Sequence, residues 1–553
     1  MKRAVFAILL VGLITALGSA QELLLPLNQF QQGSEYFSPI LGLCEDYPRG
    51  TFAEDIEQDF ALMAEYGITD LRISIAWGDY EFAKGYTEWW LLDDTVDLAE
   101  KYGINLYPYI CYAPTWATRA AWKSPPENLQ DWYDFVYEAV DRYKGRIHYW
   151  ELWNEGDNED FWVGTWEEQL ELVKVGAQAV KDANPEAKTV FGGLTKKDPR
   201  HVETIFTSGV ADYVDVINIH FYNETWDATP TERIYDQVKQ VADVIRRHGG
   251  RQELWVAEIG YSDYVEPNGR VSYWVRTRAP YEKTRLFQAV TFARSYALLA
   301  ATQDVSNILW YEVKNLRSTS AAIGDVNNYH LGALDENLFP KHLWFAVASV
   351  KQLFAEPFTV IDSKLLIDKQ TARQPYVHAF QRQNGDVIVM AWNRGTATES
   401  IAVTVPGRFG GALQHTVTGN KRSFAFAASG NDTTLQLELR PEDVTIIELF
   451  AQEMPGRLSL VECAAEQLSD GVYRISATVV NRGGRRIEQV VVELIPDSNL
   501  EVISGELAQI AGLDAGESVS LTWNVKASGQ SRGQLWVVAR DKAAGPAAEL
   551  IEI

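Results

Sequence analysis

Residues 91–110 read LLDDTVDLAEKYGINLYPYI, and this stretch holds one complete helix–strand unit. Apolar residues recur at helical spacing over 91–102, which predicts an amphipathic helix. Gly103 follows at the point where a helix must end. The run 104–110 is rich in residues that favour strands, so we expect a strand directly after the glycine.

The same alternation continues on both sides of this unit, between about residues 35 and 350. The β-like runs are 36–43, 70–76, 104–110, 147–153, 189–193, 214–221, 254–259 and 307–311. The helical patterns between them include 54–66, 91–102, 129–143, 165–183 and 231–248. Eight such strands with interposed helices fit an α/β fold of the (β/α)8 TIM barrel type better than an open doubly wound sheet. No Gly-x-Gly-x-x-Gly turn follows the first strand, which argues further against a dinucleotide-binding fold.

The pattern changes after residue 358 to short alternating strands separated by Gly, Asn and Pro turns, which is typical of β-sandwiches. Residues 453–456, Glu-Met-Pro-Gly, look like a linker. We therefore expect a catalytic barrel over 21–357, a β-sandwich accessory domain over 358–452 and an immunoglobulin-like β-sandwich over 456–553.

The first twenty residues have the layout of a secretory signal peptide. Lys2 and Arg3 precede an apolar run over 4–16, and small residues stand at 18–20, before Gln21. The apolar run is shorter than the ~20 residues that a membrane span needs. We expect export with cleavage, to the periplasm, the cell surface or the medium, and no membrane span.

The formal net charge of −25 argues against nucleic acid and anionic membranes as partners, because both favour basic patches. Cys44, Cys111 and Cys463 are too few and too scattered for a disulfide framework or a zinc cluster. A bridge between Cys44 and Cys111 stays open, but buried thiols are favoured. The histidines show no metal-binding spacing, so we expect no metal and no cofactor.

Two glutamates stand where barrel enzymes carry their active sites, at the carboxyl ends of strands. The fourth run ends in Asn154-Glu155, close to Trp150 and Trp153. Burial among these rings would raise the pKa of Glu155 and keep it protonated, although a loop carboxylate that caps the next helix is the alternative. Glu258 interrupts the apolar seventh run, where an ionised carboxylate needs partners.

Together the two glutamates predict glycosidic hydrolysis. One carboxyl group protonates the leaving oxygen while the other attacks the anomeric carbon, and a separation of about 5–5.5 Å gives retention of configuration. The enrichment in tryptophan, 18 residues in all, fits stacking on sugar rings as well as ordinary core packing.

The chain resembles the clan A glycoside hydrolases, and within them family 39 most. YWELWNE at 149–155 is similar to the acid/base motif of the clan, WVAEIG at 255–260 to its nucleophile motif, and YAPTWA at 112–117 to a loop of family 39. The resemblance implies that Glu155 is the acid/base and Glu258 the nucleophile of a double displacement on a β-linked poly- or oligosaccharide. One departure is Gly156, where the clan usually has proline.

The resemblance also implies supporting roles for four polar residues. Asn154 would hydrogen-bond the sugar 2-hydroxyl, and His220 would contact the sugar. Tyr222 would hold the nucleophile, and Arg72 would pair with it and keep it ionised. Two of them also have a structural alternative: a satisfied structural histidine for His220, and an ion pair inside the barrel for Arg72.

Three aromatic residues are candidates for stacking on the substrate. Trp310, on the eighth run, resembles the platform beneath the scissile sugar, and Trp116 and Tyr261 are further candidates. Core packing is the alternative for all three.

Two other functions stay open at this point. A family 5-like endo-β-glucanase or mannanase would use the same catalytic residues. A non-catalytic carbohydrate-binding protein on the same barrel would be expected to lose a catalytic glutamate or its neighbours, whereas Asn154, Glu155, Tyr222 and Glu258 are all present.

Overall fold

The computed structural model describes residues 27–28, 33–118, 120–273, 275–317, 325–369, 374–505, 507–528, 533–541 and 543–553. The predicted signal peptide over 1–20 lies outside the described residues. Within the described ranges, no helix is both long enough and apolar enough to cross a membrane.

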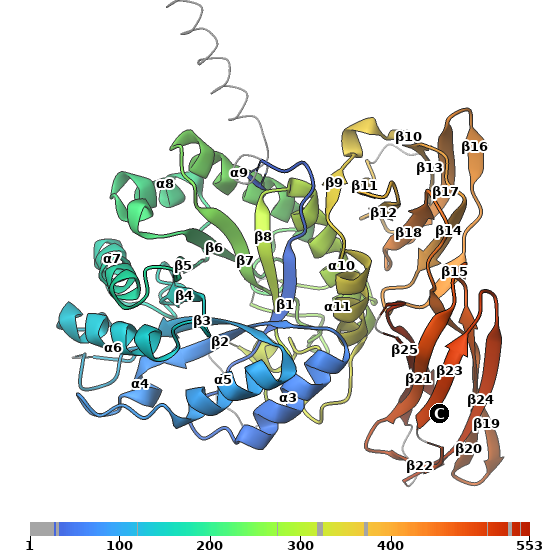
Figure 1. Cartoon of the computed structure of the whole chain (residues 1–553), viewed down its shortest axis with the longest axis horizontal. Coiled ribbons are helices and arrows are strands. Elements are labelled where there is room, and N and C mark those ends of the chain that lie inside the picture. Colours follow the sequence, from blue (N-terminus) through green and yellow to red (C-terminus); the bar gives the residue numbers. More distant parts are fainter. Residues whose placement is uncertain are drawn as a thin grey trace, which may run out of the picture.

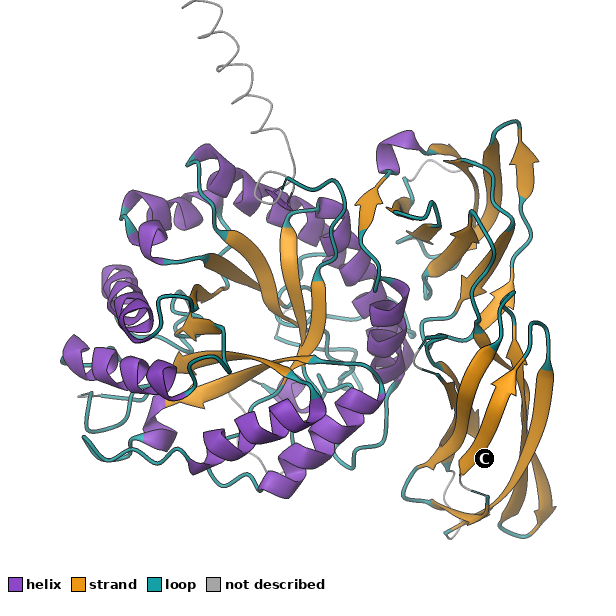
Figure 2. Cartoon of the chain, in the orientation of Figure 1, coloured by secondary structure: helices purple, strands orange, loops and turns teal. Residues whose placement is uncertain are grey.

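Eight parallel strands close into a barrel in sequence order, with β1 pairing β8, and helices surround them (Figures 1 and 2). The strands are β1 (Ile40–Cys44), β2 (Asp70–Ala76), β3 (Asn105–Cys111), β4 (Tyr149–Leu152), β5 (Lys188–Leu194), β6 (Val216–Phe221), β7 (Glu253–Ile259) and β8 (Val305–Tyr311). The predicted TIM barrel is confirmed, and each predicted strand overlaps an observed one.

The helices around the barrel are α3 (Ala53–Glu65), α4 (Trp77–Tyr80), α5 (Trp90–Tyr102), α6 (Leu129–Arg142), α7 (Trp166–Ala183), α8 (Pro199–Thr207), α9 (Ile234–Arg247), α10 (Arg285–Thr302) and α11 (His342–Leu353). Helix α5 ends where the sequence predicts, because Gly103 takes a left-handed φ of 68°. Helix α7 begins with a capping box, in which the Thr165 hydroxyl accepts the Glu168 N–H and the Glu168 carboxylate accepts the Thr165 N–H.

Two separate apolar layers follow from the alternation of side chains along the strands. One face fills the inside of the barrel with a small cluster: Cys44, Tyr107, Val190, Val216, Trp255, Ala257 and Leu309. The other face packs against the helices in the largest core of the molecule. Polar side chains at the carboxyl ends of the strands therefore converge at one mouth of the barrel.

Residues 358–450 form a six-stranded sheet of order β15-β14-β18-β12-β11-β9 and a four-stranded sheet of order β10-β13-β17-β16. Their strands are β9 (Phe358–Val360), β10 (Leu366–Lys369), β11 (Tyr376–Arg382), β12 (Val387–Trp392), β13 (Glu399–Pro406), β14 (Gly411–His415), β15 (Lys421–Ser423), β16 (Ala427–Ser429), β17 (Asp432–Leu439) and β18 (Thr445–Phe450). A separate apolar core lies between these sheets.

Residues 458–552 form two further four-stranded sheets, of order β19-β20-β24-β22 and β23-β21-β25-β26. Their strands are β19 (Leu458–Ser469), β20 (Val472–Asn481), β21 (Ile487–Pro496), β22 (Leu500–Ser504), β23 (Leu507–Leu513), β24 (Ser518–Ala527), β25 (Gln534–Arg540) and β26 (Ala547–Glu552). The chain thus follows the predicted order of a barrel and then antiparallel β-sandwich architecture.

Both sandwiches pack on the α10–α11 side of the barrel (Figure 1). From the first, the Trp392 indole donates to Glu232 Oε1 at 3.1 Å. From the second, the buried Trp536 donates to the Pro340 carbonyl at 2.8 Å and packs on Phe345 with ring centroids 4.6 Å apart. These tryptophans stabilise the contact between the sandwiches and the barrel.

Candidate active site

Glu155 leaves the end of β4 in an unusual backbone conformation. Trp153 and Glu155 have left-handed φ values of 72° and 49°, which explains why β4 stops at Leu152 and not at 153 as predicted. Left-handed backbone at non-glycine residues costs of order 1–3 kcal/mol and clusters at functional positions. This conformation places the carboxyl group of Glu155 in the barrel mouth, where it is 5% exposed.

Two neighbours fix the loop after Glu155. The side-chain Nδ2 of Asn158 donates to Glu155 Oε2 at 2.8 Å. A Cβ on Gly156 would lie 2.2 Å from the side chain of the buried Gln169 on α7. Glycine at 156, where the resemblance leads one to expect proline, thus leaves room for the Gln169 side chain in its present position.

Glu258 lies at the end of β7 and is held at both carboxylate oxygens. The Arg72 guanidinium donates to Oε2 at 2.8 Å, and the Tyr222 hydroxyl donates to Oε1 at 2.6 Å. Arg72 and Tyr222 therefore stand where the resemblance implies.

Arg72 is the centre of a wider buried network. Its guanidinium donates to both oxygens of Glu151, at 2.7 and 3.0 Å, and to Asn154 Oδ1 at 2.9 Å. Glu151 also accepts the Gly193 N–H at 2.8 Å. Burial alone would raise the pKa of Glu151, but Arg72 outweighs it and the pKa is lowered. The ionised form of Glu151 is therefore favoured, and its two bonds position Arg72.

His220 lies between the two glutamates. Its Nδ1 is 2.9 Å from Glu155 Oε1 and 3.7 Å from Glu258 Oε2. A Cβ on Gly193 of β5 would lie 1.8 Å from the imidazole ring, so glycine there makes room for His220.

The neighbouring Asn218 assigns the tautomer of His220. Asn218 Oδ1 accepts the Ala257 N–H at 2.8 Å, which fixes the amide orientation. Asn218 Nδ2 then faces His220 Nε2 at 3.3 Å as a donor. Burial lowers the pKa of His220 to about 4, so the ring is neutral and carries its proton on Nδ1, from which it donates to Glu155.

The carboxyl groups of Glu155 and Glu258 face each other across the barrel mouth. One oxygen of each lies within 4.8 Å of the other and of a ring nitrogen of His220. Such spacing would also suit a metal ion, but Nδ1 is a donor in this arrangement and not a free ligand atom. An approach of two oxygens to within 4.8 Å fits the ~5–5.5 Å separation of carboxyl groups in retaining glycosidases better than the ~6.5–9.5 Å of inverting ones.

The two carboxyl groups differ in their surroundings. Burial raises the pKa of Glu155 to about 7, even though Asn158 donates to it. Burial also raises the pKa of Glu258, and its contacts with Arg72 and Tyr222 oppose this effect. Glu155 is therefore suited to hold a proton near neutral pH, and Glu258 has the cation and the donor that an anion needs.

The structure does not bring the three predicted aromatic residues to this pair. Trp310 points out of the barrel towards α10, where it is 1% exposed and meets Phe292 edge-on with ring centroids 5.2 Å apart. The prediction that Trp310 is a stacking platform for the sugar is therefore wrong, because the side chain packs in the core between barrel and helix. Tyr261 is buried beneath the Lys283 ammonium, which lies 3.5 Å from its ring centroid. Trp116 donates to the Glu81 carbonyl at 2.7 Å and meets the buried Trp77 edge-on with ring centroids 5.6 Å apart.

Sequence reasoning missed several residues that the structure places around the pair. Tyr311, the next residue after Trp310, belongs to the inner layer of the barrel and meets Tyr222 edge-on at 6.4 Å. Tyr112 accepts a bond from Asn154 Nδ2 at 3.2 Å. Glu151 lies within the predicted acid/base motif. A carboxylate inside an apolar strand was the feature of the sequence that could have revealed it.

Cys44 and Cys111 are buried free thiols, which agrees with the interpretation that the sequence favoured over a disulfide bridge. Cys44 Sγ donates to the Ala257 carbonyl at 3.3 Å, so the thiol is part of the barrel interior.

No family model matches the chain. Solved structures do match the chain. A family 39 glycoside hydrolase from the gut symbiont Bacteroides cellulosilyticus WH2 has a TM-score of 0.57 at 20% identity, over 74% of this chain and 81% of that chain. The barrel fold is shared with family 39.

The other two named structures give the same picture. A monomeric β-xylosidase from Caulobacter crescentus CB15 has a TM-score of 0.52 at 16% identity, over 75% of this chain and 97% of that chain. A family 30 subfamily 8 xylanase from Clostridium acetobutylicum has a TM-score of 0.50 at 14% identity, over 76% and 98%. At these identities the likeness shows the fold alone.

Proposed function

We propose that the chain is a retaining glycoside hydrolase that cleaves β-glycosidic bonds in poly- or oligosaccharides, with Glu155 as acid/base and Glu258 as nucleophile. The observation that carries the proposal is the facing pair itself. Two buried carboxyl groups lie within 4.8 Å of each other at the barrel mouth, one with its pKa raised to about 7 and the other paired with Arg72.

In the first step, Glu258 attacks the anomeric carbon and the C–O bond to the leaving sugar breaks. Glu155 gives its proton to the departing oxygen, and a covalent glycosyl–Glu258 ester remains. The Tyr222 hydroxyl and Arg72 hold the Glu258 carboxylate in one orientation for this attack. Asn154, which is held by Arg72, is available to bond the sugar 2-hydroxyl.

In the second step, Glu155 is an anion and takes a proton from a water molecule that attacks the anomeric carbon. The ester bond to Glu258 breaks, and the sugar leaves with its original configuration. His220 Nδ1–H, 2.9 Å from Glu155 Oε1, stabilises the ionised Glu155 in this half of the cycle. Atoms and charge are conserved in both steps with Glu155, Glu258, the sugar and water alone, so neither step uses a cofactor.

The named structures support a carbohydrate substrate, because they include a β-xylosidase and a xylanase. β-Xylosides therefore belong in the first substrate panel, beside β-glucosides and β-mannosides.

We also propose that the protein is exported through a signal peptide over residues 1–20. The basic start, apolar run and small residues of the sequence support this. Expression of the full chain in a secreting host, followed by mass measurement, tests it. The mature protein should begin at Gln21, and retention of Lys2 and Arg3 would contradict it.

The test of the proposed activity is a screen of the purified protein on aryl β-glycosides and β-linked polysaccharides. Glu258→Ala should abolish turnover, and Glu155→Ala should slow it and respond to added azide, which replaces water as nucleophile without needing a base. Glu159→Ala, an exposed glutamate on the same loop, is the matched control and should leave activity unchanged. Turnover that survives Glu258→Ala would overturn the proposal.

A further inference from the structure

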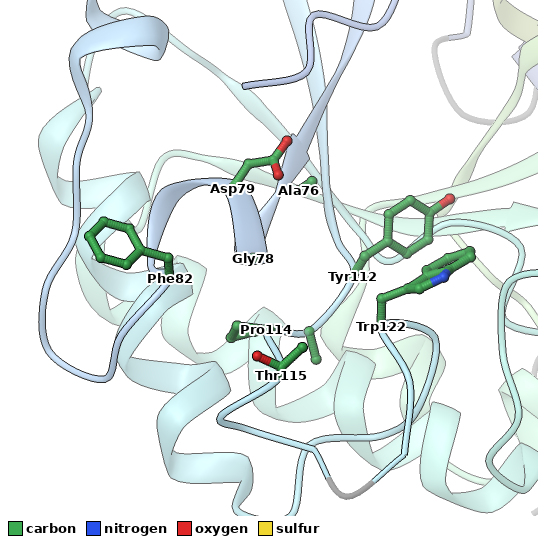
Figure 3. Close-up of a pocket in the computed structure, with 9 residues that line it drawn as sticks. Ala76, Gly78, Asp79, Phe82, Tyr112, Pro114, Thr115 and Trp122 are labelled. Carbon is green, nitrogen blue, oxygen red and sulfur yellow. The ribbon is translucent and has the colours of Figure 1, made fainter. Parts of the chain in front are cut away.

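A pocket of about 350 Å³ opens at the carboxyl ends of β2 and β3 (Figure 3). Its walls come from the end of β2, from the short helix α4 with Phe82 after it, and from the loop after β3. The lining residues are Ala76, Gly78, Asp79, Phe82, Tyr112, Ala113, Pro114, Thr115 and Trp122. Neither Glu155 nor Glu258 is among them, so this space is distinct from the point where the bond is cleaved.

Tyr112 forms a wall between the pocket and the catalytic residues. Its hydroxyl accepts a bond from Asn154 Nδ2 at 3.2 Å, and Asn154 is the neighbour of Glu155. The Tyr112 carbonyl accepts the Gly78 N–H at 3.1 Å, which ties the two pocket loops together. The pocket is thus separated from Asn154, and from the Glu155 beside it, by the Tyr112 side chain alone.

The pocket exposes aromatic surface of the kind that sugar rings stack on. Trp122 and Phe82 are 37% and 49% exposed, although most tryptophans of the barrel are buried. Trp122 meets Tyr112 edge-on with ring centroids 4.7 Å apart, which holds the indole at the pocket wall. Exposed apolar side chains in a concave region mark ligand-binding sites.

The polar groups of the pocket favour a neutral ligand. Asp79 contributes a carboxylate and Thr115 a hydroxyl, and none of the lining residues is a lysine or arginine. The nearby Arg49 donates from its backbone N–H to Asp79 Oδ2 at 3.1 Å and from its guanidinium to the Asp79 carbonyl at 2.9 Å. Its guanidinium also pairs with Glu88 and stacks on Phe82 at 5.0 Å, so its charge is compensated outside the pocket lining. A carboxylate beside an open aromatic wall suits sugar hydroxyl groups and disfavours a uronic acid.

We propose that this pocket binds a neutral sugar unit of the substrate, next to the sugar whose bond is cleaved, with Trp122 as the principal stacking surface. This inference rests on the proposed glycosidase function and adds to it that the substrate is a chain of neutral sugars.

The test compares kcat/KM on neutral β-linked oligosaccharides of increasing length with kcat/KM on the matching aryl glycoside of one sugar. Trp122→Ala should lower the value for the longer oligosaccharides by roughly tenfold and leave the one-sugar substrate unchanged. Trp122→Phe should restore most of the loss, because it keeps an aromatic face. Trp90→Ala, at a 45% exposed tryptophan on α5 outside the pocket, is the matched control and should change neither.

Calorimetric titration of the Glu258→Gln protein with the same oligosaccharides separates this inference from the proposed activity. Loss of affinity in Glu258→Gln/Trp122→Ala would support the pocket even if the wild-type protein hydrolysed none of the panel. The inference is overturned if Trp122→Ala affects the one-sugar and the long substrates equally, if it affects neither, or if uronate-bearing chains bind better than neutral ones. It is also overturned if no oligosaccharide binds.

Discussion

Arg72 donates to Glu258 Oε2 at 2.8 Å from a guanidinium that is 1% exposed. The same guanidinium is bound by Glu151 through two hydrogen bonds, so the cation on β2 connects carboxylates on β4 and β7. Because the interior of a protein screens charge poorly, this network decides the ionisation of Glu258 more than solvent does.

Arg72→Lys is expected to lower kcat/KM and to move the acidic limb of its pH profile to higher pH. One ammonium cannot serve Glu151, Asn154 and Glu258 together, so Glu258 loses an opposing charge and its pKa rises further. The measurement is kcat/KM against pH on an aryl glycoside, with thermal unfolding beside it. A lowered Tm is also expected, since leaving one partner of a buried pair uncompensated costs about 3–5 kcal/mol in other proteins.

Arg146→Lys is the control for this substitution. Arg146 pairs with Asp97 and Glu100 on the surface, where ion pairs contribute about 0–1 kcal/mol. An acidic limb that stays in place in Arg72→Lys, with activity reduced uniformly, would show that Arg72 acts on the fold and not on Glu258.

Glu155 should set the alkaline limb of activity near pH 7. The acid must be protonated in the first step, and burial raises its pKa to about 7, so kcat/KM falls as the pH rises through that value. Glu155→Gln, assayed on an aryl glycoside with a good leaving group that needs no protonation, should lack this limb. A limb that persists in Glu155→Gln would assign it to another group.

The same pKa predicts a stability difference. The native state holds the Glu155 proton up to about pH 7, whereas the unfolded chain releases it near its ordinary value of 4.5, so stability falls as the pH rises between these values. Glu155→Gln should match the wild-type stability at pH 4 and exceed it at pH 8 by up to about 3 kcal/mol. Chemical denaturation at the two pH values measures this, with Glu159→Gln as an exposed control. Equal stabilities at pH 8 would contradict it.

Gly156→Ala is expected to destabilise the protein by about 1–3 kcal/mol and to lower kcat, because the new Cβ would lie 2.2 Å from Gln169 and push the Glu155 loop outward. Gln169→Ala should restore part of both losses. The Gln169 amide has no hydrogen-bond partner within the described part of the chain, so its removal leaves no polar group unpaired. Additive effects of the two substitutions would contradict a direct clash.

Arg394 links the first sandwich to the barrel loop that follows Tyr222. It donates to Glu224 at 2.8 Å and also pairs with Glu232. Burial would raise the pKa of Glu224, but the contact with Arg394 outweighs burial and lowers this pKa to about 2. The ion pair therefore stabilises the folded protein at pH values above the ordinary pKa of a glutamate, and this stabilisation is lost as the pH falls towards 2. Arg394→Ala should lower Tm at pH 7 more than at pH 3 and should separate the unfolding of barrel and sandwich. Arg408→Ala, on an exposed turn of the same sandwich, is the control. An equal loss of Tm at both pH values would contradict the account.

The strands and the main site residues could be predicted because their signals are local. β2 spans Asp70–Ala76, as the pattern predicts, and Gly103 marks the end of α5 both in the prediction and in the structure. Glu155 and Glu258 could be found because a carboxylate at the end of an apolar strand is costly without a purpose. The partners Arg72, His220 and Tyr222 required the resemblance as well.

The aromatic candidates could not be placed from sequence. Successive residues of a strand point to opposite faces, and in a barrel both faces are buried, so Trp310 and Tyr311 look alike in the sequence. The structure turns Trp310 to the helices and Tyr311 to the inner layer. Trp122 was missed because it lies in an irregular loop, where no periodicity indicates which side chains face a pocket.

Trapping of the covalent intermediate tests the central claim most directly. A 2-fluoro glycoside with a good leaving group, matched to the sugar found in the screen, slows the second step and leaves the ester in place. Peptide mass spectrometry should then find one added sugar, on Glu258, in the wild-type protein and none in Glu258→Gln. A sugar attached to another carboxylate, or turnover of ordinary substrates with inversion and no trapped ester, would contradict the account.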